Sequence, residues 1–457
     1  MIVMKIGGSS VDCAASIERV AGIVRGYQDR RPVIVVSAMA KTTRRLLESA
    51  EAAASGDLET ALAIFDELVE YHRREAYGVV PPGGRARLDA MLDPWFGELR
   101  VHLDELAATR ALTPRAADAV ASYGELLASA ILSSALTHAG VDSAWIDCRR
   151  VIVTDHEFTR AQPLYGPTDA RLRDALLPLL AAGKVAVLGG YVGATPSGVV
   201  TTLGKEGSDF SAAIVGAALG AEEILIWTDV DGILTADPRV YPQARRVRTL
   251  SFGEALELAC SGAKKPHFGT LGPAGRADVP IRILNSRHVE SEGTLIGRRD
   301  PDAPATVKSI ACRANDHLLS LRARQGAAAD GFLPGVLAVC ERFRPELLLL
   351  AGDERSATLA LHHSDRLAEI RLALDDLGVL NIEEGGLVVS IVSDDLAASP
   401  ELVERTLAAA GELDPRLVLA GVSSPCVRFT VLEERLPGII ADLHARLLPG
   451  GPEEVVQ

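Results

Sequence analysis

The densest group of residues that could do chemistry lies between residues 189 and 239. A glycine-rich turn, a threonine pair and a second glycine loop precede Ser208 and Asp209, which stand at the predicted start of a helix. Glycine loops that lead into a helix N-terminus gather backbone N–H groups and the positive end of the helix dipole, which suits phosphate oxygens. Thr228 and Asp229 follow an apolar strand, where open α/β sheets bind ligands. The segment predicts an enzyme that handles phosphate groups of small metabolites.

Lys5 is a second candidate, because it interrupts an apolar strand directly before the Gly7-Gly8 turn. A lysine held at such a strand end can neutralise phosphate charge during phosphoryl transfer. The alternative is an edge lysine that points into solvent, and the adjacent turn favours the first interpretation. Asp209 also has two interpretations. With Ser208 it is either an ordinary helix cap, worth about 1 kcal/mol, or a carboxylate that holds lysines between two phosphate-bearing substrates.

Composition limits the class of protein. The chain has 457 residues, enough for two or three domains, and its net charge of −14 argues against nucleic acid or an anionic membrane as partner. Its six cysteines are scattered without a CxxC pair, which favours reduced thiols over a metal site or a disulfide framework. We find no run that approaches a membrane span and no room for a signal peptide, so we expect a soluble, cytoplasmic protein.

The elements that must position these residues alternate between strands and helices over the first part of the chain. Apolar strands are expected at residues 32–38, 185–188 and 224–227, and residues 43–139 have the composition of a helical lobe inserted between strands. This pattern predicts a three-layer α/β/α sandwich with a mostly parallel sheet. We expect this catalytic domain to cover residues 1–298.

The rest of the chain has a different pattern. Residues 299–308 have the charge and proline content of a linker. In residues 309–449, short apolar stretches alternate with helices such as those expected at 368–377 and 436–448, which suits two small βαββαβ units in tandem. We expect residues 450–457 to form a disordered tail.

Six motifs occur in an order and at a spacing that resemble those of the aspartate kinases, a family of the amino acid kinase superfamily. They are MKIGGSS, VVSAMAKTT, SYGE, TTLGKEGSDFSAA, WTDVDGILTADPR and SGAKKPH. The resemblance implies ATP- and Mg²⁺-dependent phosphorylation of the L-aspartate β-carboxylate to 4-phospho-L-aspartate, the first step towards lysine, threonine, methionine or related metabolites. It also implies that the C-terminal units are ACT-like domains that bind amino acids and form a homodimer.

The same resemblance implies a role for each matching residue. Lys5 would contact the transferring phosphate, Asp209 would organise the charges around it, and Glu125 would pair with the substrate α-ammonium. The positions that match substrate-binding residues are Thr43, Glu125, Tyr191, Lys205 and Ser208. Those that match ATP-binding residues are Lys5, Gly7, Gly8, Ser9, Thr228, Asp229, Leu234, Arg239 and Lys264. No metal ligand is assigned.

The chain departs from the family pattern on the acceptor side. The family reads G-R-G-G-S-D where this chain reads GKEGSD, so Lys205 replaces an arginine and Glu206 a glycine. The bidentate grip of that arginine on a substrate carboxylate is not reproduced by an ammonium. Arg44 and Lys265 are further unusual charges. Two alternatives therefore stay open: a kinase that forms an acyl phosphate on another carboxylate, or a degenerate, non-catalytic regulatory homologue.

The C-terminal region departs as well. Leu348 stands where lysine-controlled family members carry an aspartate, and a serine-serine-glutamate turn becomes Ser423-Ser424-Pro425. We therefore expect an ACT-like fold that serves as a dimer scaffold and has lost its lysine pocket.

Overall fold

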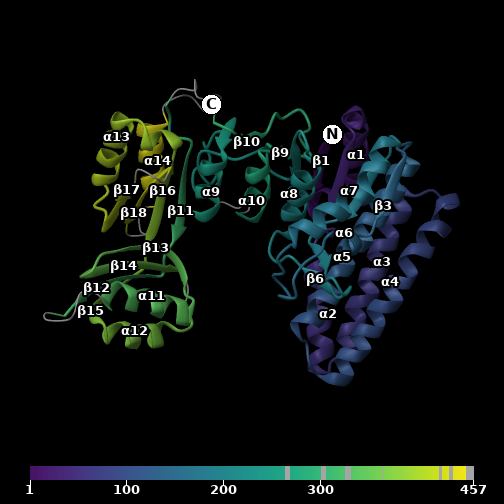
Figure 1. Ribbon diagram of the computed structural model, residues 1–457, viewed down its shortest axis with the longest axis horizontal. Coiled ribbons are helices and arrows are strands. Elements are labelled where there is room, and N and C mark those ends of the chain that lie inside the picture. Colours follow the sequence, from purple (N-terminus) through teal and green to yellow (C-terminus); the bar gives the residue numbers. More distant parts are fainter. Residues whose placement is uncertain are drawn as a thin grey trace. The chain divides into compact units, whose positions relative to one another are not determined.

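The computed structural model describes residues 1–262, 268–299, 305–324, 331–362, 364–420, 425–431 and 436–448. The chain divides into two compact units (Figure 1). The first comprises Met1–Ile233 and His267–Arg298, and the second comprises Leu234–Pro266 and Arg299–Gln457. Residues 234–266, which the sequence placed in the catalytic domain, thus group with the C-terminal region. The predicted disordered tail, residues 450–457, lies outside the described residues.

The sheet of the first unit has the strand order β3-β4-β2-β1-β7-β9-β10. Its strands are β1 (Ile2–Ile6), β2 (Pro32–Val36), β3 (Ser143–Ile146), β4 (Val185–Gly189), β7 (Ile224–Thr228), β9 (Ile281–Asn285) and β10 (Thr294–Gly297). All neighbours are parallel except β10, which runs antiparallel to β9. Strands β1, β2, β4 and β7 are buried along their whole length, as apolar strands of a covered parallel sheet must be. The predicted mostly parallel sheet is confirmed.

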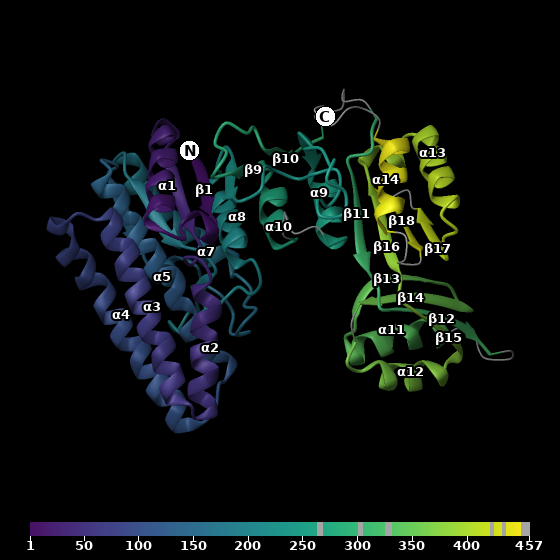
Figure 2. The same ribbon diagram turned by 180° about the vertical axis from the view of Figure 1, so that it is seen from behind.

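Helices cover this sheet and extend from it as a lobe. They are α1 (Ala14–Gly26), α2 (Thr42–Ser55), α3 (Leu58–Val79), α4 (Pro82–Thr109), α5 (Pro114–His138), α6 (Cys148–Val151), α7 (Tyr165–Ala181), α8 (Gly207–Leu219) and α10 (Phe268–Ala277). The lobe consists of α2 to α5, which pack on one another and run side by side (Figure 2). A short hairpin of β5 (Val192–Ala194) and β6 (Val200–Thr202) also packs against α5.

Helix α5 is central to the first unit. Thr113 caps it by accepting a hydrogen bond from the Ala116 backbone N at 3.2 Å, and Pro114 occupies its first turn. The helix is long and apolar enough to cross a membrane, which corrects our expectation that no run approaches a span. However, 89% of its most apolar window is buried inside the unit. Its apolar character is therefore explained by its contacts with α2, α4 and β4.

The second unit contains two four-stranded antiparallel sheets. Its elements are β8 (Thr249–Ser251), α9 (Phe252–Cys260), β11 (Ser309–Ala314), β12 (His317–Ala323), α11 (Phe332–Phe343), β13 (Glu346–Gly352), β14 (Ser356–His362), α12 (Leu367–Asp375), β15 (Gly378–Glu384), β16 (Leu387–Val392), α13 (Pro400–Gly411), β17 (Leu417–Ala420), β18 (Cys426–Val431) and α14 (Leu436–Leu447). One sheet has the order β13-β14-β12-β15 and the other β11-β16-β18-β17. Strand β11 comes before β12 in the chain but pairs with β16, so the first βαββαβ unit is inserted into the second.

Each small sheet has its own core, and a third cluster joins them. Phe332 and Leu359 belong to the core of the inserted unit, whereas Ile391 and Phe429 belong to the core of the other. The joining cluster contains Leu318, Leu349, Ala360 and Val388, with Leu348 packed against it. Strand β13 has an irregularity between Leu347 and Leu349, so Leu348 is an extra, bulged residue of that strand.

Candidate active site

A buried ion pair lies beneath the predicted phosphate-binding loops. The Lys5 Nζ is 2.6 Å from the Asp209 Oδ1, and the two residues are 4% and 1% exposed. Lys5 comes from the C-terminal end of β1, and Asp209 from the first turn of α8. The structure therefore brings together the two residues that the sequence singled out as catalytic. Lys5 does not point from an edge strand into solvent, because β1 lies between β2 and β7.

Close backbone contacts explain the glycines around this pair. A Cβ atom on Gly8 would lie 2.4 Å from the Ala38 carbonyl oxygen, and one on Gly190 would lie 2.7 Å from the Ser208 Cα. A Cβ on Gly207 would meet the Tyr191 ring at 2.7 Å. Only glycine fits such approaches without movement of the backbone. The two glycine turns can therefore pack against the strand ends and the start of α8.

A pocket of about 490 Å³ opens beside the start of α8. It is lined by Gly8, Ser9, Ser37, Ala38, Ala40, Thr43, Glu125, Thr159, Tyr191, Gly204, Lys205, Glu206, Gly207 and Ser208. All five residues that matched substrate-binding positions line this pocket, together with two of the residues predicted to bind ATP. The pocket is mixed in character, with glycine backbone, hydroxyl groups and charges of both signs. This composition suits a small zwitterion beside a phosphate group.

Glu125 presents a buried carboxyl group to this pocket. Its Oε1 accepts a hydrogen bond from the Ala38 backbone N at 3.2 Å. Within the described residues, nothing donates a hydrogen bond to its buried Oε2. Burial raises the pKa of Glu125 to about 8, against the smaller opposing effects of the Ala38 hydrogen bond and the Lys5 charge. A buried acceptor that lacks a donor is costly, so a ligand ammonium would satisfy it.

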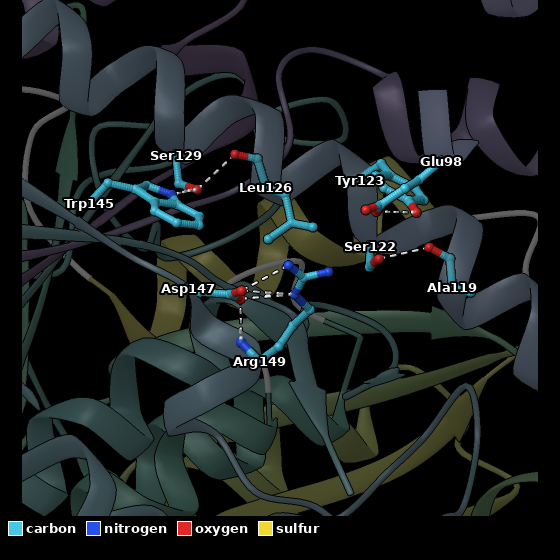
Figure 3. Close-up of polar contacts among 9 residues, drawn as sticks. All are labelled: Glu98, Ala119, Ser122, Tyr123, Leu126, Ser129, Trp145, Asp147 and Arg149. Atoms are coloured by element: carbon cyan, nitrogen blue, oxygen red, sulfur yellow. Dashed lines mark hydrogen bonds and ion pairs between the residues drawn. The ribbon is translucent and has the colours of Figure 1, made fainter. Parts of the chain in front are cut away.

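Polar contacts fix the orientation of α5 and so of Glu125 (Figure 3). On one side, the Tyr123 hydroxyl donates to Glu98 of α4 at 3.1 Å. On another, the Trp145 Nε1 donates at 2.9 Å to the Ser129 Oγ, which donates to a carbonyl of its own helix. These contacts tie the helix to the lobe and to the sheet edge at β3. Glu125 is therefore presented by a rigid element rather than by a loop.

The loop before α8 contains the two family departures. Lys205 is exposed, and Glu206 has a φ of +56° as the residue that precedes the first turn of α8. This left-handed conformation is the one that glycine adopts without strain. Arg44, which the sequence offered as a neighbouring charge, donates to Glu48 at 2.8 Å one turn further along α2. Lys265 lies outside the described residues.

Tyr191 has a positive φ of 63°, and a hydrogen bond of its backbone N–H holds it in place. Its N–H donates to the Ser211 Oγ at 2.9 Å, and that hydroxyl donates to the Gly207 carbonyl at 2.9 Å. Burial raises the pKa of the Tyr191 phenol to about 12, so the ring is neutral in the pocket wall. Ser211 was missed by sequence analysis, because a serine inside a helix is usually unremarkable.

The residues predicted to bind nucleotide are arranged differently. Gly7 follows β1, and its N–H donates to the Trp227 carbonyl at 3.0 Å. Thr228 ends β7 with its hydroxyl 3.2 Å from the Asp229 Oδ1, and Asp229 is exposed. Leu234 and Arg239 belong to the second unit, where the exposed Arg239 donates to Asp237 from its backbone N at 2.9 Å. Lys264 lies outside the described residues.

Comparison with known proteins identifies the family. The family model described as the amino acid kinase family matches residues 1–285. Lysine-sensitive aspartokinase 3 of Escherichia coli (strain K12) is 30% identical over 98% of this chain and 99% of its own length. Aspartokinase 1, chloroplastic, of Arabidopsis thaliana is 30% identical over 98% of this chain and 80% of its own length.

Solved structures agree with these sequence relatives. A crystal structure of E. coli aspartokinase III in complex with aspartate and ADP, in its R-state, has a TM-score of 0.81 at 29% identity and covers 98% of this chain and 99% of its own. The aspartate kinase of Clostridium acetobutylicum, at 20% identity, shares the fold with a TM-score of 0.80 over 98% of this chain and 100% of its own. The chain belongs to the amino acid kinase family and, within it, to the aspartokinases.

Proposed function

We propose that this chain is an aspartate kinase, which transfers the γ-phosphoryl group of ATP to the β-carboxylate of L-aspartate. The observation that carries the proposal is the pairing of Lys5 with Asp209 beside a pocket that contains Glu125. The first two supply a fixed charge for phosphoryl transfer, and the third supplies an acceptor for an amino-acid ammonium. The aspartokinase relatives, one of them crystallised with aspartate and ADP, support the same substrates.

In this mechanism the protein positions and neutralises charge. Glu125 accepts hydrogen bonds from the α-ammonium, and the Ser208 hydroxyl and Lys205 hold the substrate carboxylates at the start of α8. The β-carboxylate then faces the γ-phosphorus for in-line attack, which forms the new P–O bond as the bond to ADP breaks. Lys5, oriented by Asp209, neutralises charge on the transferring group. Thr43 and the Tyr191 ring close the acceptor side.

The proposal includes Mg²⁺ bound with ATP. In the described parts of the chain, no three His, Cys, Asp or Glu side chains gather as a metal site. Mg²⁺ requires less from the protein, because it keeps several waters and binds through substrate phosphates and one or two carboxylates. We therefore assign the metal to the nucleotide phosphates and not to a cluster of protein side chains. When bound, it would supply further neutralisation of phosphate charge.

A homodimer through the C-terminal unit and a cytoplasmic location belong to the same proposal. Strand β15 is an edge of its sheet and leaves Val379 65% exposed, and an open strand edge can pair with a second copy. The scattered cysteines of the sequence favour a reducing compartment. Sedimentation of the full chain, with Val379→Lys as the variant expected to give monomers, tests the dimer.

A kinase for a different amino dicarboxylate is the second candidate. The specific observation in its favour is that Glu206 lines the pocket where the family carries a glycine. A carboxylate there repels the two carboxylates of L-aspartate unless it is neutralised nearby. It would favour an acceptor that carries an additional positive or hydrogen-donating group.

Trapping the acyl phosphate with hydroxylamine tests the function. The full chain, supplied with ATP, Mg²⁺ and L-aspartate, should give aspartyl hydroxamate in proportion to the ADP released. Hydroxamate from another amino dicarboxylate but not from aspartate would establish the second candidate. Absence of hydroxamate with every acceptor tried would contradict both and leave the non-catalytic homologue.

A further inference from the structure

Asp118 is a buried carboxylate outside the pocket lining that joins three separate segments. It lies near the start of α5 and is 1% exposed. Its Oδ2 accepts hydrogen bonds from the backbone N of Thr159 at 2.9 Å and of Thr202 at 3.0 Å. Its Oδ1 accepts a third from the Thr202 hydroxyl at 2.6 Å. One side chain therefore connects α5, the loop of residues 155–162 and strand β6.

Both segments held by Asp118 lead directly into the pocket wall. Thr159 lines the pocket itself, and Thr202 is separated by one residue from Gly204, where the pocket loop begins. The two segments also bind each other, because the Ala161 N–H donates to the Thr202 carbonyl at 2.9 Å. A Cβ on Gly204 would lie only 3.1 Å from the Thr159 carbonyl oxygen. A displacement of Asp118 would therefore also displace the loop at Gly204.

Helix α5 connects this contact to the ammonium site. Asp118 and Glu125 are the two acidic residues of α5 and are seven positions apart, so they lie on the same face of the helix. Seven residues span about 10 Å along a helix axis. Helix α5 thus carries both Glu125, the proposed ammonium acceptor, and Asp118, which anchors the segments at Thr159 and Thr202.

Energetics support a specific role for this carboxylate. Burial raises the pKa of Asp118, whereas its three hydrogen bonds act in the opposite direction. An apolar residue at this position would leave the buried Thr202 N–H and the part-buried Thr159 N–H without their acceptor, which is costly above all for Thr202. The contact is therefore a specific polar feature of a helix that is largely buried.

We propose that Asp118 is a positioning residue for the phosphoryl acceptor, because it sets the distance between Glu125 and the loop of residues 203–208. It touches neither substrate in this account and acts through Thr159 and Thr202. The inference rests on the proposed function as far as the acceptor is concerned. Within the described residues, the hydrogen bonds of Asp118 go to Thr159 and Thr202 and to none of the residues predicted to bind nucleotide, so its loss should impair the acceptor side selectively.

Kinetics of three variants test this proposal. Asp118→Ala should raise KM for L-aspartate about tenfold to a hundredfold, the cost of a displacement of about 1 Å in a positioned group, and leave KM for ATP within about twofold. Asp118→Asn should restore most of the affinity, because its oxygen can accept from both backbone N–H groups while its amide donates to the Thr202 hydroxyl. Should Asp118→Ala fold poorly, Thr202→Val, which removes one of the three donors, provides a milder form of the same test.

Glu254 provides the matched control. It is a buried carboxylate in the second unit, it accepts from the Ser251 and Asp394 backbone N, both at 2.9 Å, and burial raises its pKa as well. Glu254→Ala should lower the melting temperature and leave KM for aspartate unchanged. If Asp118→Ala changes the two KM values equally, or changes neither while it lowers the melting temperature, Asp118 is merely structural and the proposal is overturned.

Hydrogen exchange separates failure of this inference from failure of the proposed function. In Asp118→Ala, amides of residues 159–161 and 202–208 should exchange faster than in the wild type, and those of β1 and β7 should not. This result is expected whether or not aspartate is the acceptor. Unchanged exchange at residues 202–208 would overturn the positioning role of Asp118. Absence of hydroxamate from the wild type with L-aspartate would overturn only the proposed substrate.

Discussion

The acceptor side and the nucleotide side of the proposed site are built in different ways. On the acceptor side and at the point of phosphoryl transfer, Glu125, Lys5 and Asp209 are all buried and come from α5, β1 and α8. Among the residues predicted to bind nucleotide, Asp229 and Arg239 are each exposed within their own unit, and Arg239 bonds to a residue two positions away. The first group is held by packing and by the Lys5–Asp209 ion pair, whereas Asp229 and Arg239 are open to solvent.

This difference indicates which part of the site costs folding free energy. Burying Lys5 with Asp209 and leaving one oxygen of Glu125 without a donor both cost folding free energy, which a preorganised site requires. Exposed charges cost little and contribute little before a ligand arrives. Substitutions on the acceptor side should therefore have larger effects than those on the nucleotide side, and the following predictions test that order.

The largest effect is expected at the buried pair. Lys5→Gln or Asp209→Asn should lower kcat by about a hundredfold to a thousandfold, because each removes a charge that acts on the transition state. Both should also lower the melting temperature, since a buried charge loses its partner. Arg100→Ala, in an exposed pair with Asp104 on α4, is the control and should change neither quantity. A near-normal kcat in either site variant would show that the pair is only structural.

Next in size is the effect of Glu125 and its pH dependence. Glu125→Gln should raise KM for aspartate about tenfold to a hundredfold, the value of a charge-assisted hydrogen bond. Because the pKa of Glu125 is raised to about 8 in the empty pocket, the carboxylate that binds an ammonium becomes more populated as pH rises from 6.5 to 8.5. KM for aspartate should therefore fall over that range in the wild type and stay flat in Glu125→Gln. A flat profile in both proteins would contradict this role.

The raised pKa also sets the sign of a stability effect. A folded-state pKa of about 8 against an ordinary value of 4.5 means that the contribution of Glu125 to stability is present below pH 4.5 and is lost as pH rises towards 8. Thermal melts of Glu125→Gln and the wild type should therefore diverge between these pH values, with the variant relatively more stable at pH 8 than at pH 5.

A smaller effect is expected in the loop before α8. Lys205→Arg combined with Glu206→Gly should lower KM for aspartate about tenfold and change KM for ATP less, because a bidentate donor is regained and a pocket carboxylate is removed. Glycine also adopts the φ of +56° at position 206 without strain. Loss of activity in this double variant would instead identify Glu206 as a specificity residue for another acceptor.

The smallest effect is expected when free L-lysine is added as a possible inhibitor. Leu348 is packed against an apolar cluster between the two small sheets and offers no charge to an amine. L-lysine at micromolar to millimolar concentration should therefore leave activity unchanged, as measured by ADP release at subsaturating aspartate. Inhibition by lysine would show that the effector pocket involves other residues.

The sequence was most informative where local patterns decide the structure. The apolar runs at β1, β2, β4 and β7 and the glycine turns beside them predicted the sheet, and the five substrate-matching residues lie on one pocket. The insertion of one small unit into the other was not predicted, because strand pairing between β11 and β16 leaves no local signal. The grouping of residues 234–266 with the second unit rests on long-range contacts, such as that of the Thr235 hydroxyl with the His444 Nε2, which leave no local signal either.

Asp118 shows a second limit of prediction from the sequence. A lone aspartate near a helix start usually indicates a favourable dipole interaction and nothing more. Its importance lies in donors that are 41 and 84 positions away in the sequence. The only available signal was an acidic residue seven positions before Glu125 in a strongly apolar helix. Contacts of that range follow from the fold and not from a motif.

We expect the acceptor pocket to hold a protonated Glu125 that ionises when it binds the substrate ammonium. Calorimetric titration of L-aspartate at pH 7, in buffers of different ionisation enthalpy, measures the protons released on binding. With the pKa of Glu125 raised to about 8 before aspartate binds, we expect release of most of one proton by the wild type and none by Glu125→Gln. Binding of aspartate without proton release, or release that persists in Glu125→Gln, would contradict it.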